Sequence, residues 1–265
     1  MNNSPIGIFD SGIGGLTVAK EIVKNLPLES LIYIGDTARV PYGPRSKEIV
    51  TQFAKELVNF LLKKNVKVLV VACNTISAQS LEEVKKLSSI PVIDVLTPAV
   101  EKAISATKSK KIGVIGTQGT INSKAYEKAI RLLDPSIEVI SVACPLFVPL
   151  AEEGLYKHQA TKSLAADYLD HIKESGVDTL ILGCTHYPLL LDTIAKTVGP
   201  RITLIDSALP TVGELKKVLK EKNMLSEDPN STHEFFVTDA PEKVFKVASR
   251  FFGQELKNKI KKVTL

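Results

Sequence analysis

The stretch "VLVVACNTISA" (Val68–Ala78) joins an uninterrupted apolar run, which ends at Cys73, to a more polar segment that begins with Asn74. An apolar run without polar alternation is typical of a parallel strand that is buried on both faces. A second stretch, "TLILGCTHYP" (Thr179–Pro188), ends in the same way on Cys184. The two stretches predict matching strand-to-helix joints, each with a thiol at the carboxyl end of its strand.

Short apolar runs of this kind alternate with longer segments of helical period along the chain. The other expected strands are IGIFD, LIYIGD, PVIDV, KIGVIG, IEVISVA, ITLID and HEFFV. Clear helical patterns cover Lys47–Lys64, Ser77–Leu87, Ser123–Leu133, Thr161–Ser175 and Tyr187–Val198. Alternation of strands and helices is the pattern of α/β proteins with mainly parallel sheets, so this is the predicted fold class.

The first half of the chain also matches the second half in order. IGIFDSGIGG parallels IGVIGTQGTI, LIYIGD parallels EVISVA, VKVLVVACNT parallels VDTLILGCTH, and PVIDVLTP parallels ITLIDSALP. Ordered matches with a slowly drifting offset indicate two related units with small loop insertions. The proline-containing joints DVLTPAV and DSALPTV are candidate crossovers between the units, because proline ends elements.

We therefore expect two pseudo-symmetric, interleaved α/β domains with the active site in the cleft between them. The first comprises residues 1–96 plus 209–265, and the second comprises residues 97–208. The segment from about Pro210 onward, with its Phe-rich strand and a final basic helix, is expected to pack back on the first unit.

Composition places the chain among soluble globular proteins, because 44% of its 265 residues are hydrophobic and 24% are charged. No leader-like start and no run of about 18 apolar residues is visible, so we expect a cytoplasmic protein that does not span a membrane. Three cysteines without C-x-x-C spacing predict free thiols and no metal site. The formal charge of +5 comes from scattered lysines, which predict solvated surfaces and no nucleic-acid partner.

The two matched cysteines are the strongest candidates for chemistry. Ligands of open parallel sheets bind at the carboxyl ends of the strands, and a helix N-terminus favours a thiolate. One cysteine at a strand end is more often a small buried hydrophobe, but two at matched positions favour a catalytic pair. Cys144, in the loop VACPLF, has no such counterpart and is interpreted as structural. Two thiols on opposite faces of one substrate carbon would invert its configuration, because one removes a proton and the other returns a proton to the opposite face.

Other signals are weaker one by one. The turn DSGIGG (Asp10–Gly15) follows a strand and precedes a helix, so its N–H groups are candidates to cradle an anion, although a glycine turn without a ligand is an equal alternative. The loop GDTARVPYG (Gly35–Gly43) would ordinarily be a surface connection. His186 stands two residues after Cys184, where it is suited to orient or activate that thiol.

Taken together, these motifs resemble the glutamate racemase family, cofactor-independent two-cysteine enzymes that make D-glutamate for peptidoglycan. The resemblance rests on IGIFDSGIGGLTV, YIGDTARVPYGPRS, VVACNTISA, IGVIGTQGTINS, CPLFVPLAEEG and LILGCTHYPLL. These motifs span the chain from Ile6 to about Ala208. No long extension precedes IGIFDSG, so the precursor-activated regulation associated with such extensions is not expected.

The resemblance implies that Cys73 and Cys184 are the acid/base thiols and that Asp10 and His186 assist them. It implies further acidic positions linked to catalysis, Asp36 and Glu152. The implied substrate contacts are Asp10, Ser11, Tyr42, Gly43, Asn74, Thr75, Thr185 and His186, with Thr117 and Thr120 as additional candidates. It also implies L- and D-glutamate as substrates, a homodimer, and no cofactor or metal.

This assignment is chemically coherent. Loss of the α-proton leaves carbanion character beside a carboxylate, and no pyridoxal lysine site is recognisable to delocalise it. Hydroxyl, amide and backbone N–H donors around the carboxylate are then required. The alternatives are a racemase of the same group that acts on aspartate or a hydantoin, and a non-catalytic relative that binds a small anion or a topoisomerase.

Overall fold

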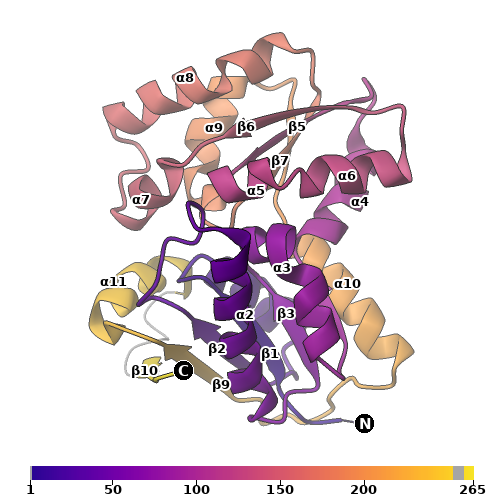
Figure 1. The fold of residues 1–265 in the computed structure, drawn as a ribbon, viewed down its shortest axis with the longest axis vertical. Coiled ribbons are helices and arrows are strands. Elements are labelled where there is room, and N and C mark those ends of the chain that lie inside the picture. Colours follow the sequence, from indigo (N-terminus) through magenta and orange to yellow (C-terminus); the bar gives the residue numbers. More distant parts are fainter. Residues whose placement is uncertain (1, 253–259) are drawn as a thin grey trace.

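In the computed structural model, residues 2–252 and 260–265 are described, and they form two parallel sheets (Figure 1). The first sheet has the order β10-β9-β2-β1-β3-β4 and contains β1 (Ile6–Asp10), β2 (Leu31–Gly35), β3 (Val68–Val71), β4 (Val92–Asp94), β9 (His233–Val237) and β10 (Ile260–Lys262). The second has the order β6-β5-β7-β8 and contains β5 (Lys111–Gly116), β6 (Glu138–Ala143), β7 (Thr179–Gly183) and β8 (Thr203–Ile205).

The two sheets repeat one arrangement. The first four strands along the chain have the order β2-β1-β3-β4, and the next four have the equivalent order β6-β5-β7-β8. Each matched pair of sequence stretches therefore occupies the same place in its sheet, and all pairings are parallel. The predicted α/β class with parallel sheets is confirmed, while the exact domain boundaries stay a prediction.

Helices connect the strands and cover both faces of each sheet (Figure 1). They are α1 (Leu16–Asn25), α2 (Lys47–Leu62), α3 (Asn74–Leu87), α4 (Leu96–Ala106), α5 (Gln118–Asn122), α6 (Ala125–Leu133), α7 (Phe147–Glu152), α8 (Gln159–Glu174), α9 (Leu191–Val198), α10 (Ala208–Glu221) and α11 (Pro241–Phe252), with a short 3-10 turn η1 (Tyr187–Leu190) before α9. Each predicted helix is present within a few residues. Helix α3 begins earlier than expected, because Cys73 already has the extended backbone of an N-cap.

The chain crosses between the sheets at the two predicted proline joints. After β4 it enters α4 and then β5, and after β8 it enters α10 and then β9. The expectation that these prolines end elements is wrong, because Pro98 and Pro210 lie in the first turns of α4 and α10. Backbone N–H groups there have no intrahelical partner, so proline is tolerated. Asp94 and Asp206 accept hydrogen bonds from backbone N–H groups at the starts of these two helices.

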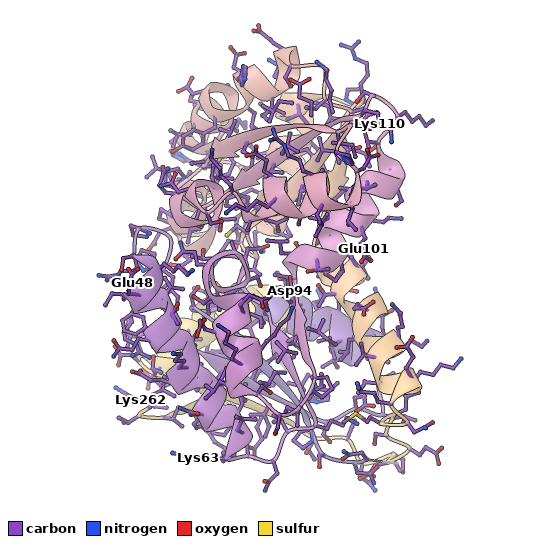
Figure 2. All side chains as sticks on the ribbon, turned by 45° about the vertical axis from the view of Figure 1, so that its right-hand side comes forward. Glu48, Lys63, Asp94, Glu101, Lys110 and Lys262 are labelled. Carbon is purple, nitrogen blue, oxygen red and sulfur yellow. The ribbon has the colours of Figure 1, made fainter. Side chains whose placement is uncertain are left out.

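The segment after Pro210 returns to the first sheet, where β9 pairs with β2 and β10 pairs with β9. Helix α11 matches the expected final helix, whereas Ile260–Lys262 is strand β10, and residues 253–259 lie outside the described part. Lysines spread over separate parts of the surface, as Lys63, Lys110 and Lys262 show in Figure 2.

Burial on both faces explains the continuous apolar strands. Ile8 and Val70 pack on one side of the first sheet against α1 and α10, and Leu69 and Val71 pack on the other side against α2 and α3. All residues of β1, β2, β3 and β7 are buried. Each fully buried Val, Leu or Ile contributes about 1.5–3 kcal/mol, so these strands contribute substantially to stability. No helix in the described ranges is both long and apolar enough to cross a membrane.

Candidate active site

Residues that follow four different strands line one small cavity. Ser11 follows β1, Cys73 follows β3, Thr117 follows β5 and Cys184 follows β7. The cavity has a volume of about 30 Å³ and is lined by Ser11, Val40, Pro41, Tyr42, Gly43, Cys73, Asn74, Thr75, Thr117, Val148, Cys184, Thr185 and His186. The structure therefore brings the two matched thiols from the two sheets to the same cavity.

Cys73 lies beside a hydroxyl and a buried carboxylate. Its Sγ is 3.3 Å from Ser11 Oγ. Burial and the nearby charge of Asp10 raise the pKa of the Cys73 thiol to about 12, against the opposing effect of hydrogen bonds from Ser11 and the Ile76 N–H. At Cys73 desolvation outweighs the N-terminal donor, which by itself lowers the pKa as expected, and the role of a thiolate here stays a prediction.

Asp10 is fully buried at the end of β1, directly behind the cavity wall. Its Oδ2 accepts a hydrogen bond from the Gly12 N–H at 3.0 Å, and its Oδ1 has no hydrogen-bond partner among the described residues. A buried carboxylate oxygen without a donor is costly and is rarely retained without a role. Asp10 is thus placed to act on Cys73 through its charge rather than through the lining of the cavity.

Cys184 lies beside a histidine and a second carboxylate. Its Sγ is 3.9 Å from His186 Nδ1, and His186 Nε2 is 3.1 Å from Oε1 of Glu152, the last residue of α7. Burial lowers the pKa of His186, but the contacts with Cys184 and Glu152 outweigh burial and raise it to about 10. Both ring nitrogens of His186 thus have a partner, and these contacts favour its protonated form.

The glycines of the first turn allow the two halves to approach closely. A Cβ on Gly14 would lie 2.3 Å from Thr185 Oγ1 and 2.5 Å from His186 Nδ1. A Cβ on Gly15 would lie 2.7 Å from the Cβ of Asp10. The glycines therefore allow close packing of the β1 joint against the β7 joint, while a role of the turn in binding an anion stays a prediction.

Polar donors cluster at the start of α3. Asn74 Oδ1 accepts a hydrogen bond from Tyr126 Oη at 2.6 Å, whereas its buried Nδ2 has no partner in the described part of the chain. Thr75 Oγ1 lies 3.0 Å from Thr117 Oγ1, which in turn lies 3.0 Å from Thr120 Oγ1. The first N–H groups of a helix also lack intrahelical partners. This side of the cavity thus offers several donors suited to a carboxylate.

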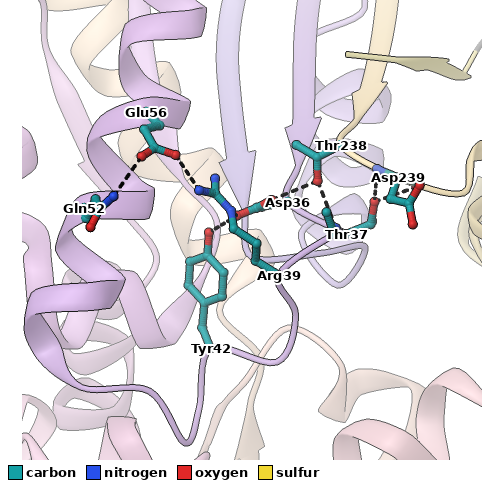
Figure 3. A network of polar contacts seen from close by, with 9 residues as sticks. Asp36, Thr37, Arg39, Tyr42, Gln52, Glu56, Thr238 and Asp239 are labelled. Carbon is teal, nitrogen blue, oxygen red and sulfur yellow. Dashed lines mark hydrogen bonds and ion pairs between the residues drawn. The ribbon is translucent and has the colours of Figure 1, made fainter. Parts of the chain in front are cut away.

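Of the predicted site residues, Asp10, Asp36, Glu152 and Thr120 are absent from the lining. Glu152 contacts the lining residue His186, and Asp10 is near enough to Cys73 to raise its pKa. Asp36 is fully buried behind Tyr42, whose hydroxyl donates to its Oδ2 (Figure 3). The lining also includes Val40, Pro41 and Val148, which sequence analysis did not single out. They lie within quoted motifs, but apolar side chains carry no chemical signal that would have identified them.

Comparison with known proteins agrees with this geometry. The family model of Asp/Glu/hydantoin racemases matches residues 7–215. The chain belongs to this racemase family. A glutamate racemase from Geobacter metallireducens is 50% identical over 254 residues, which cover 95% of this chain and 93% of that protein.

Solved structures of racemases share the whole fold. Glutamate racemase isoform RacE1 from Bacillus anthracis has a TM-score of 0.96 and 44% identity, with 100% of this chain and 99% of that chain covered. Glutamate racemase from Francisella tularensis in complex with D-glutamate has a TM-score of 0.94 and 40% identity. The match covers 100% of this chain and 98% of that chain. The predicted enzyme class is thereby confirmed for this racemase, while the roles of single residues stay predictions.

Proposed function

We propose that this racemase interconverts L- and D-glutamate by removing and returning the proton on the α-carbon, without a cofactor. The observation that carries the proposal is that Cys73 and Cys184, from equivalent joints of two repeated halves, line one cavity. The substrate assignment is supported by highly similar relatives that are glutamate racemases, one of them in complex with D-glutamate.

In the proposed reaction, the thiolate of one cysteine takes the α-proton and the thiol of the other gives its proton to the opposite face of the same carbon. The first sulfur ends protonated and the second ends as a thiolate, so the enzyme is then ready for the reverse direction. Asp10 assists Cys73 in this reaction. His186, which contacts Glu152, assists Cys184. General acid–base steps of this kind contribute roughly 10²–10⁴-fold each.

The intermediate carries negative charge on the substrate carboxylate. We assign its stabilisation to Asn74 Nδ2, the N-terminal N–H groups of α3, and the hydroxyls of Ser11, Thr75 and Thr185. Preorganised donors in a closed cavity are effective because no solvent has to reorganise. The unpartnered Asn74 Nδ2 supports this assignment, since a buried amide donor requires an acceptor.

The wider role follows from the substrate. We propose that the enzyme supplies D-glutamate for peptidoglycan, works in the cytoplasm and forms a homodimer. We also propose that its two domains comprise residues 1–96 plus 209–265 and residues 97–208. The paired sheets on either side of the cavity support this division.

The test follows exchange of the α-hydrogen in deuterated water, starting separately from L- and D-glutamate. We expect Cys73→Ser and Cys184→Ser to lose racemisation, whereas Cys144→Ala, which alters a buried thiol outside the cavity, retains it. Full activity in either serine variant would contradict the two-thiol mechanism. Wild-type protein that equilibrates aspartate or a hydantoin but not glutamate would overturn the substrate assignment. Protein that exchanges none of these amino acids but still binds glutamate would favour a binding role.

A further inference from the structure

The loop between β2 and α2 forms one wall of the catalytic cavity. Val40, Pro41, Tyr42 and Gly43 of this loop all line the cavity. The segment is neither helix nor strand, so ladder hydrogen bonds do not hold it in place. One backbone hydrogen bond holds its end, from the Gly119 N–H to the Gly43 carbonyl at 2.8 Å. Its side-chain contacts converge on one buried carboxylate.

Asp36 is that carboxylate, and it accepts from three donors. Its Oδ2 accepts from Tyr42 Oη and, at 2.6 Å, from Arg39 Nε. Its Oδ1 accepts from Thr238 Oγ1 at 2.8 Å. Asp36 is fully buried and lies outside the cavity lining, so it has no contact with the space where a substrate carbon would lie.

Arg39 connects this carboxylate to helix α2 (Figure 3). Its NH1 donates to Glu56 Oε2, and Gln52 Nε2 donates to the other oxygen of Glu56 at 3.3 Å. The Arg39 guanidinium carbon also lies 4.0 Å from the ring centroid of Phe53, a cation–π contact. Phe53 packs against the ring of Tyr42 with 5.4 Å between centroids. Arg39 is thus held by two carboxylates and one aromatic face.

Thr238, just beyond β9, connects the same loop to the C-terminal segment. Its N–H donates to the Gly35 carbonyl at 3.2 Å, and its Oγ1 accepts from the Ala38 N–H at 2.9 Å. Next to it, the Thr37 hydroxyl donates to the Asp239 carbonyl at 2.7 Å and accepts from the Asp239 N–H at 2.9 Å. These reciprocal bonds join parts of the chain that are about 200 residues apart in sequence.

We infer that Asp36, Arg39 and Thr238 form a positioning cluster that fixes Tyr42 and Gly43 against the catalytic cavity and thereby sets the affinity for substrate. Asp36 acts through Tyr42 and not on the substrate, because its oxygens are committed to three donors. The Tyr42 phenol proton is used in the same contact, so the ring and backbone of Tyr42, not its hydroxyl proton, face the substrate. The kinetic part of this inference rests on the proposed function.

The test compares Thr238→Val, which at nearly constant volume removes the donor to Asp36 and the acceptor for the Ala38 N–H, with Thr238→Ser, which keeps the hydroxyl. Thr107→Val is the matched control, because the Thr107 hydroxyl donates to Asp178 at 2.7 Å at the opposite end of the second sheet. Hydrogen–deuterium exchange of residues 36–46, read by mass spectrometry, reports on the loop independently of activity. We expect faster exchange there only in Thr238→Val.

Steady-state kinetics supply the second readout. We expect Thr238→Val to raise KM for both enantiomers about tenfold, the equivalent of one lost hydrogen bond to a charged group, with kcat changed less than about threefold. Thr238→Ser and Thr107→Val should keep the wild-type KM. Arg39→Lys keeps the positive charge but lacks the planar guanidinium group that donates to both Asp36 and Glu56. We expect it to raise KM and the rate of loop exchange to an intermediate degree.

The outcomes separate the two proposals. Unchanged loop exchange in Thr238→Val and Arg39→Lys would overturn the positioning cluster whether or not the protein is a glutamate racemase. Faster loop exchange with an unchanged KM would show that the loop is tethered but does not set affinity, which also contradicts the inference. Absence of glutamate racemisation in the wild type would instead count against the proposed function alone.

Discussion

At the scale of single residues, the two thiols have different electrostatic surroundings. Cys73 faces a buried carboxylate, Asp10, and its pKa is raised to about 12. Cys184 lies beside His186, whose other ring nitrogen contacts Glu152 and whose pKa is raised to about 10. The sequence indicated this difference, because Asn74 directly follows the first thiol, whereas Thr185 and then His186 follow the second. The structure adds that one neighbour is a carboxylate and the other an imidazole, so the two proton-transfer steps need not have equal barriers.

The pH dependence of His186 follows from its shifted pKa. Its folded pKa of about 10 lies above the ordinary value of 6.5, so protonation of His186 stabilises the folded protein. This contribution, on the order of a few kcal/mol, is complete below about pH 6.5 and is lost as the pH rises through about 10. We expect the difference in free energy of unfolding between wild type and His186→Asn to be largest near pH 6 and to shrink toward pH 10. Urea denaturation across this range measures it, and a difference independent of pH would contradict the assignment.

At the scale of elements, the strand-to-helix joints position the chemistry. The glycine turn after β1 is close enough to the joint after β7 that a Cβ on Gly14 would contact Thr185 and His186. Sequence patterns predicted the strands and longer helices well, because burial on both faces leaves a continuous apolar signal. They did not identify α7, a six-residue helix that supplies Glu152, because so short an element has no clear period.

The glycine turn gives a matched pair of substitutions. Gly14→Ala should lower the free energy of unfolding by about 1–3 kcal/mol, because the new methyl group displaces the Thr185 and His186 side chains. It should also reduce kcat/KM at least tenfold. Gly213→Ala, in α10 with no atom within 4 Å of the added carbon, should raise stability by about 0.5–1 kcal/mol and leave kcat/KM unchanged. Thermal unfolding and racemisation rates measure both effects, and equal behaviour of the two variants would count against the close contact.

At the scale of the whole molecule, the cavity between the two sheets is narrow. Its volume of about 30 Å³ has room for roughly two water molecules, which is less than a glutamate molecule needs. The walls come from both sheets, so we expect the two halves to move apart when substrate enters. Contacts that such a movement would break include the Gly119 N–H to Gly43 carbonyl bond at 2.8 Å and the Thr75 to Thr117 contact at 3.0 Å.

A ligand that contacts both halves should stabilise the whole protein. At a concentration of 100 times Kd, glutamate should add about 2.7 kcal/mol to the free energy of unfolding. We expect both enantiomers to raise Tm in Cys73→Ser and Cys184→Ser, which keep the donors around the carboxylate but lack racemisation. Scanning calorimetry with aspartate as the comparison ligand measures this. A Tm that responds to aspartate more than to glutamate would contradict the substrate assignment.

The sequence alone determined the α/β class, the two repeated halves and the pairing of Cys73 with Cys184, because buried strands and their terminal residues leave a local pattern that repeats. Only the tertiary structure decided that Glu152 contacts His186, that Asp36 lies behind Tyr42, and that Thr238 bonds to Asp36. These contacts join residues far apart in the chain, and a polar side chain has no local pattern that reveals its partner. The raised pKa of Cys73 likewise depends on the tertiary structure, because desolvation is caused by everything that packs around the sulfur.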